Sequence, residues 1–93
     1  MEIKQEQTGK KGKFYIGDPE QPSAEMVYNY PSEKVMIIEH TEVKDELRGQ
    51  HIGHKLLKSL VDYVRANDIK VIPLCPFASS VFKKTPEYAD VLK

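Results

Sequence analysis

The residues best suited to chemistry stand together in one stretch, residues 47–54, with the sequence Leu-Arg-Gly-Gln-His-Ile-Gly-His. A β-branched run precedes this stretch and a segment with helical apolar spacing follows it. A strand that passes through a glycine-containing turn into a helix leaves the first backbone N–H groups of that helix unpaired. Those donors and the positive end of the helix dipole bind anions. The stretch therefore predicts a site for a phosphate or pyrophosphate.

Reactive side chains lie on either side of this stretch. Cys75 is the one cysteine of the chain, and Glu39 and His40 stand upstream. A nucleophilic thiolate would need a nearby base such as His40 or Glu39. Because neighbours on a strand point to opposite faces, only one of the two is expected in a cleft. The alternatives are a small buried core cysteine and a solvated strand end.

Three imidazoles could in principle hold zinc. His51 and His54 are three residues apart, and His40 is the third histidine. No cysteine pair or acidic ligand completes the set in the sequence, so we expect no metal site.

A helix after the turn would position these groups. Ile52, Leu56, Leu57, Leu60, Val61 and Val64 recur with helical spacing. Lys55, Lys58, Asp62 and Arg65 occupy the opposite face, and Asn67 suits a left-handed stop.

The remaining pattern predicts strands. Residues 2–8, 14–16, 24–30, 35–43 and 69–74 carry β-branched, aromatic or alternating side chains, separated by Gly- and Pro-rich turns. Residues 77–84 predict a second helix that ends before Pro86, followed by a short packed turn. The expected fold class is α+β: an antiparallel four-strand meander, then one βαβ unit with a parallel fifth strand, then a C-terminal helix.

Bulk properties narrow the function further. With 93 residues, the chain is expected to form a single domain over residues 1–93. Its 14 basic and 14 acidic residues argue against a nucleic-acid partner. The N-terminus lacks the apolar core of a signal peptide, and no run has membrane-spanning length. We expect a cytoplasmic monomer or weak dimer.

The turn resembles a known motif. The turn contains an Arg, then two residues, a small position, one further residue and a Gly. This pattern is similar to the pyrophosphate-binding turn of the GNAT superfamily of N-acetyltransferases. His51 stands where the family usually has Gly. Pro73 lies in the last strand, where GNAT folds splay their fourth and fifth strands apart. Cys75-Pro76-Phe77, then Phe82 and Thr85-Pro86-Glu87-Tyr88, resemble a small GNAT-like group of about this length.

This resemblance implies a reduced GNAT-like fold that binds acetyl-CoA and acts on an unidentified amine. It implies a pyrophosphate site at the turn, a pantetheine arm between the strands that end near Val43 and Leu74, and catalytic roles for Cys75, His40 and Glu39. The implied cofactor-binding residues are Val43, Arg48, Gly49, Gln50, His51, Ile52, Gly53, His54, Leu74, Phe77 and Phe82.

Three functions remain open from the sequence. The first is an N-acetyltransferase that moves acetyl to an amine, directly or by way of Cys75. The second is a non-catalytic CoA or acyl-CoA-binding module. The third is a plain interaction domain, which applies if the turn is only structural.

Overall fold

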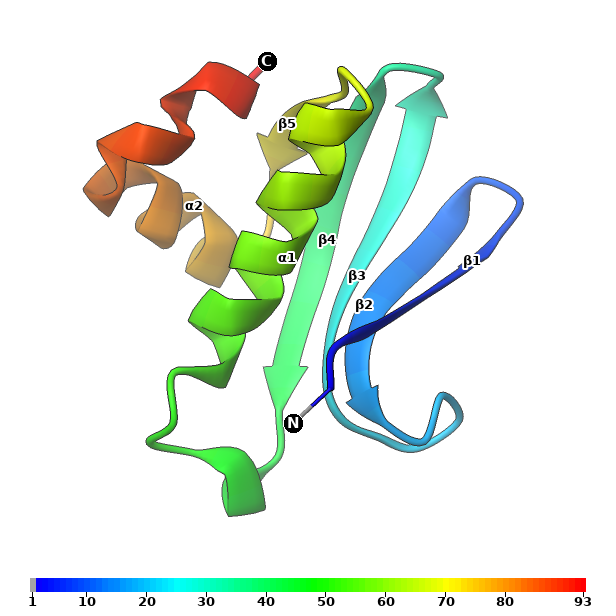
Figure 1. Ribbon diagram of the computed structural model, residues 1–93, viewed down its shortest axis with the longest axis vertical. Coiled ribbons are helices and arrows are strands. Elements are labelled where there is room, and N and C mark those ends of the chain that lie inside the picture. Colours follow the sequence, from blue (N-terminus) through cyan, green and yellow to red (C-terminus); the bar gives the residue numbers. More distant parts are fainter. Residues whose placement is uncertain (1) are drawn as a thin grey trace.

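The computed structural model describes residues 2–93, which form a five-stranded sheet with two α-helices and two short 3-10 helices (Figure 1). The elements follow the order β1 (Lys4–Thr8), β2 (Lys11–Gly17), β3 (Pro22–Ser32), β4 (Val35–Val43), η1 (Asp45–Leu47), α1 (Ile52–Ala66), β5 (Lys70–Pro73), α2 (Pro76–Lys84) and η2 (Pro86–Val91).

The sheet has the strand order β1-β2-β3-β4-β5. The first four strands are antiparallel, and β5 pairs parallel with β4. A parallel neighbour requires a crossover, which α1 supplies. The predicted α+β meander with one βαβ unit is therefore confirmed.

The parallel ladder between β4 and β5 is short. It ends where Ile38 pairs with Pro73, whereas β4 continues to Val43. Proline has no N–H for a ladder, so Pro73 stops the pairing. The backbone N–H groups of Leu74 and Cys75 then both donate to the Ile38 carbonyl, at 3.1 and 3.0 Å. Beyond this point the two strands separate, as expected from the proline.

A β-bulge lies at the same level of β4. Tyr28 of β3 pairs with Ile38 and the preceding Val27 pairs with His40, so Glu39 is an extra residue without an opposite partner. A bulge bends its strand and changes which residues share a face. Its effect on Glu39 and His40 is described with the site.

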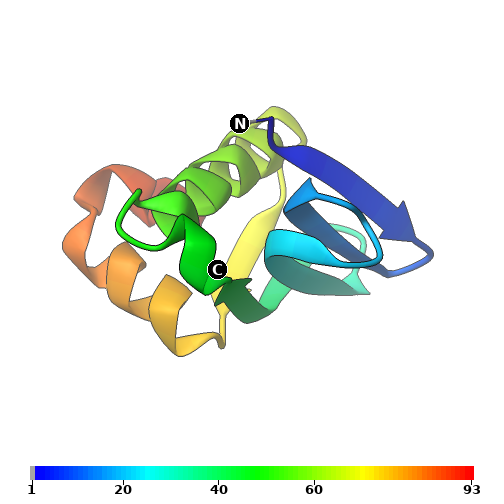
Figure 2. The ribbon, with the colours of Figure 1, turned by 90° about the horizontal axis from the view of Figure 1, so that it is seen from below.

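The core lies between the sheet and α1. We call the sheet face covered by α1 the helix face and the opposite one the outer face. Seven α1 residues are buried, including all six that the helical spacing identified. Figure 2 shows α1 running across the sheet, with α2 and η2 beside the β5 edge. Among residues 2–93, no helix is long and apolar enough to cross a membrane.

The end of α1 differs by one residue from the expectation. Asn67 has φ −115°, and Asp68 adopts the left-handed conformation with φ 56°. Asn67 instead donates its side-chain amide to the carbonyl of Tyr63 at 2.8 Å. This bond secures the last turn while the chain reverses one residue later.

Candidate cofactor-binding site

A pocket of about 350 Å³ opens where the end of β4, the loop before α1 and the N-termini of both α-helices meet. Thr41 and Val43 line it from β4, and Phe77 lines it from α2. The remaining lining residues are Leu47, Arg48, Gly49, His51, Ile52, Gly53 and His54. Most of the residues predicted to bind a cofactor thus surround one cavity.

The loop before α1 has two residues with positive φ. Gly49 has φ 82°, a conformation that side chains with a Cβ rarely adopt. His51, the N-cap of α1, is left-handed with φ 57° and ψ 34°. Histidine tolerates this region better than most residues, although glycine tolerates it best. The positive φ explains why glycine is usual at this position in GNAT turns. His51 can take its place because histidine is one of the residues that tolerate this conformation.

The start of α1 favours an anion electrostatically. Within residues 2–93, no side chain caps this helix start, and its first turn contains no acidic residue. The first backbone N–H groups of a helix have no intrahelical acceptor and carry the positive end of its dipole. Arg48 adds a guanidinium at the rim, paired with Asp45 at 3.0 Å. Both side chains are mostly exposed, so this ion pair is weak and Arg48 can exchange partners.

Gly53 brings the two helices together. A Cβ at this position would lie 2.7 Å from Cζ of Phe77, closer than real contacts allow. The ring of His54 packs edge-on against Phe77, with centroids 5.3 Å apart. Gly53 is one of the implied cofactor-binding residues, and its missing side chain also makes room for Phe77. The phenyl ring then forms one wall of the pocket.

The segment 39–43 of β4 offers an unpaired backbone edge. Beyond Ile38 its ladder to β5 has ended, while its other edge still pairs with β3. N–H and C=O groups on a free strand edge can accept an extended ligand as an added strand. Thr41 and Val43 project from this segment into the pocket. An extended amide-bearing chain such as pantetheine suits this edge.

Cys75 lies behind the pocket. The cysteine is only 3% exposed, belongs to the hydrophobic core and does not line the cavity. Its Sγ–H donates to Oγ1 of Thr41 at 3.3 Å. The expected base beside the thiol is therefore replaced by a hydroxyl. Sequence reasoning missed Thr41, because the bulge at Glu39 determines which way it points.

Glu39 and His40 share the outer face, which corrects the expectation that they point to opposite faces. The Glu39 carboxylate accepts a hydrogen bond from the Asn29 side chain and pairs with Lys11 at 3.7 Å. His40 Nε2 lies 3.7 Å from the Glu42 carboxylate. The bulged residue causes this arrangement, because it removes the usual alternation across one step of the strand. Neither side chain faces Cys75.

The histidines do not assemble into one group. The His51 and His54 rings are 5.7 Å apart at the start of α1. His40 instead lies near Glu25 and Glu42, with potential ligand atoms within 4.8 Å of one another. These carboxylates come from sequence positions that the histidine spacing did not indicate. Glu25 also pairs with Lys13 at 3.8 Å.

Three predicted cofactor residues lie outside the pocket lining. Gln50 belongs to the same loop, and Leu74 is a large hydrophobic residue that is 65% exposed where β4 and β5 separate. Phe82 is 5% exposed and packs against Tyr88 in the core. The position of Phe82 on α2 thus directs its ring into the core rather than into the pocket.

The strand separation, the uncapped helix start and the pocket between them define the class of fold used by GNAT acetyltransferases. Residues 13–91 match the family model described as GCN5-related N-acetyl-transferase, so the chain belongs to this family.

Two solved structures of acetyltransferase-like proteins are similar to this chain. A GCN5-like protein from Staphylococcus aureus, whose solution structure describes it as a candidate N-acetyltransferase, is 42% identical with a TM-score of 0.78. The match covers 99% of this chain and 87% of that one. Ribosomal-protein-alanine N-acetyltransferase from Brucella melitensis shares the fold at 13% identity, with a TM-score of 0.65 over 81% of this chain and 60% of that one.

Vertebrate relatives are also similar. Protein NATD1 of Xenopus tropicalis is 33% identical over 63 residues, which cover 68% of this chain and 58% of that protein. Human protein NATD1 is 32% identical over 63 residues, 68% of this chain and 56% of that protein. The chain thus spans less than two thirds of the length of these curated relatives.

Proposed function

We propose that this protein is an acetyl-CoA-dependent N-acetyltransferase. The observation that carries the proposal is the single pocket that joins the helix start at 51–54 to the unpaired edge of β4. The pyrophosphate would accept hydrogen bonds from backbone N–H groups of the loop and the first turn of α1. The pantetheine amides would pair with the free edge of residues 39–43. The family membership supports the same cofactor.

The proposed reaction is a direct transfer. The acceptor amine attacks the thioester carbonyl, the C–S bond breaks, and the CoA thiolate leaves with the electron pair. The amine proton passes to a base on the outer face of β4, and His40 is our first candidate because its side chain is 56% exposed and thus accessible. Glu39 is the second candidate, although Lys11 and Asn29 already occupy its carboxylate.

A non-catalytic acyl-CoA-binding module is the alternative function. The position of Cys75 favours this binding module over an enzyme that forms a covalent acetyl-cysteine intermediate. The thiol is buried, hydrogen-bonded to Thr41 and without an imidazole or carboxylate partner among residues 2–93. A nucleophilic thiol needs a base or a positive environment, and it must reach the thioester.

Titration with acetyl-CoA, followed by amide NMR, tests the cofactor site. We expect saturable shifts in residues 41–54 and 74–77. Arg48→Gln should weaken acetyl-CoA binding. Lys58→Gln is the matched control, because it also removes one exposed positive charge but lies outside the pocket, and it should leave binding unchanged. Acetyl-CoA that leaves these amides unshifted would refute both the transferase and the binding module.

A panel of amines with the CoA-bound protein then separates the two functions. Transfer is measured as CoA release and as acetylated amine by mass spectrometry. We expect Cys75→Ala to retain transfer and His40→Gln to lower it. Binding without transfer to any amine favours the module. Loss of transfer in Cys75→Ala, with an acetylated Cys75 in the unmodified protein, would support the covalent route instead.

A further inference from the structure

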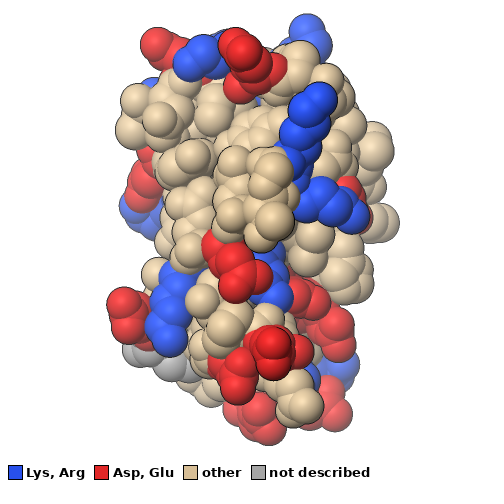
Figure 3. Space-filling view, turned by 90° about the vertical axis from the view of Figure 1, so that its right-hand side faces the viewer, with Lys and Arg blue, Asp and Glu red and all other residues tan. Residues whose placement is uncertain are grey.

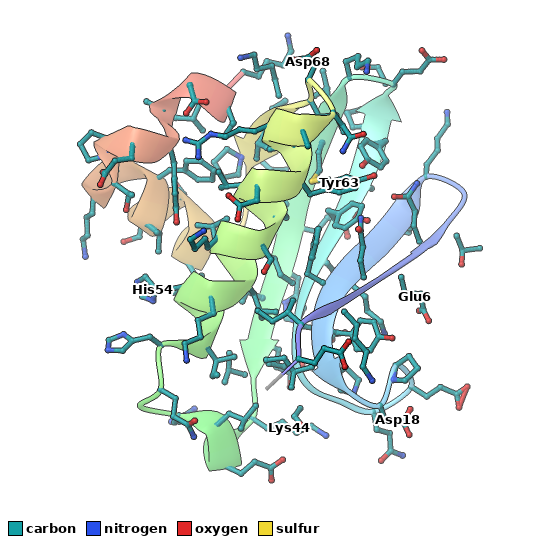
Figure 4. The ribbon with its side chains drawn as sticks, viewed as in Figure 1. Glu6, Asp18, Lys44, His54, Tyr63 and Asp68 are labelled. Atoms are coloured by element: carbon teal, nitrogen blue, oxygen red, sulfur yellow. The ribbon has the colours of Figure 1, made fainter. Side chains whose placement is uncertain are left out.

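A second groove lies away from the candidate cofactor pocket. It has a volume of about 670 Å³ and lies between the β1–β2 hairpin, the turn after β3 and the C-terminal part of α1. Small-molecule sites usually measure about 300–1,000 Å³. Figure 4 shows Tyr63 on the side of α1 that faces the hairpin, and His54 near the opposite end of the helix. The groove is therefore large enough for a ligand of its own.

Aromatic and apolar groups form part of its lining. Tyr30 of β3, Tyr63 of α1 and Ile69 border the groove. The rings are fixed by their neighbours, because Tyr30 packs edge-on against Tyr28 at 5.6 Å and Tyr63 against Phe14 at 5.9 Å. Preformed aromatic surface binds planar rings with little ordering cost.

The Tyr30 hydroxyl acts as a neutral hydrogen-bonding group. Burial, and then a hydrogen bond with Tyr63, raise the pKa of Tyr30 well above its usual range. Tyr30 thus keeps its proton at physiological pH. A phenol that keeps its proton can donate to a ligand oxygen.

The charged groups of the groove favour an anion. Lys10 and Lys34 line it, and neither has an ion-pair partner among residues 2–93. Lys34 Nζ donates to the carbonyl of Asn67 at 3.0 Å, which holds its ammonium at the groove. Glu33 is the one carboxylate in the lining. Figure 3 shows most acidic side chains of this view in its lower half, whereas acidic and basic side chains stand together at its upper end.

From this combination we propose that the groove is a second ligand site, which binds a small organic anion that carries an aromatic ring. The carboxylate or phosphate of the ligand would lie between Lys10 and Lys34, and its ring would contact Tyr30 and Tyr63. This site is separate from the transfer centre. The 15 residues of α1 span roughly 22 Å, with the cofactor pocket at the start and the groove at the end.

Benzoate and its neutral isostere benzamide, titrated into ¹⁵N-labelled protein, test the proposal. We expect benzoate to shift residues 10, 30–34 and 63–69 saturably, and to bind about tenfold more tightly than benzamide because two ammonium groups face its carboxylate. Phenyl phosphate should bind the same residues. The shifts should persist when acetyl-CoA is also present, so the outcome does not depend on the proposed function.

Variants identify the groups responsible. Lys10→Gln combined with Lys34→Gln should abolish the preference for benzoate over benzamide, while the matched exposed-lysine change Lys58→Gln should preserve it. Tyr63→Phe, which keeps the ring, should weaken benzoate binding about threefold because one donor is lost. Equal affinity for benzoate and benzamide, or shifts confined to residues 41–54, would overturn the proposal. All variants alter exposed or half-exposed side chains, and a dispersed amide spectrum checks their fold.

Discussion

Substitution of Gly53 by alanine would test the contact that joins the two helices and shapes the cofactor pocket. The new methyl group would meet the Phe77 ring at 2.7 Å from Cζ and 2.9 Å from Cε2. Gly53 is fully helical and has no positive φ, so alanine strains no backbone angle there. The whole effect should therefore come from the collision with Phe77.

Two opposing terms set the magnitude. Overfilling a packed site costs about 1–3 kcal/mol, because the neighbour must leave its preferred rotamer or the backbone must shift. Alanine in place of glycine within a helix stabilises by up to about 1 kcal/mol. Gly53 is the second residue of α1, where this gain is smaller. We expect a net loss of about 1 kcal/mol, which lowers the melting temperature by about 4–8 °C in a domain of this size.

A double-mutant cycle with Phe77→Ala isolates the contact. Urea unfolding of the native protein, both single variants and the double variant gives the coupling free energy. In the Phe77→Ala background the collision is gone, so Gly53→Ala should be neutral or slightly stabilising. Because Phe77 lines the pocket, a displaced ring should change its shape, and acetyl-CoA affinity should also fall in the single Gly53→Ala variant.

Gly49→Ala is the matched control. Its Cβ would meet nothing within 4 Å, but its φ of 82° is unfavourable for alanine. This variant should therefore be destabilised equally whether or not Phe77 is present. The reasoning fails if Gly53→Ala has the same effect in both backgrounds, because the helix contact would then not exist.

Three further predictions concern backbone strain and titration. His51→Gly should be more stable than His51→Ala in urea by about 1 kcal/mol, because φ is positive at this N-cap position. The Arg65 guanidinium lowers the pKa of Asp90, so this pair stabilises the fold above the ordinary aspartate pKa, and its contribution is lost as pH falls through the lower native value. The stability difference between the native protein and Asp90→Asn should therefore begin to shrink below about pH 4. Burial raises the pKa of Tyr28 and Tyr30, so stability should fall as pH rises above about 10. Absorbance at alkaline pH should show both phenols ionising above the ordinary tyrosine range.

Periodicity and turn chemistry were sufficient to predict the arrangement of elements. The six apolar positions from Ile52 to Val64 lie on one helical face, and that face is buried. Pro73 lacks an N–H, and the parallel ladder ends there. Gly49 precedes an uncapped helix and has positive φ. These features depend on local backbone chemistry, which can be predicted directly from the residue types.

The orientation of side chains around the candidate site could not be predicted in the same way. A single extra residue, Glu39, turns His40 to the outer face and Thr41 toward Cys75. Alternation predicts the opposite for every residue after the bulge, and nothing in the local residue types indicates where a bulge falls. Phe82 likewise matched a motif, but the packing of α2 directs it into the core.

The turn at residues 48–54 therefore contains both kinds of information. The sequence by itself predicted that its backbone donors suit an anion, because a glycine-bearing turn and a helix start are local features. Only the tertiary structure showed that this site shares one pocket with Thr41, Val43 and Phe77. Those residues come from distant parts of the chain, and their meeting depends on where β4 leaves β5 and how closely Gly53 lets α2 approach.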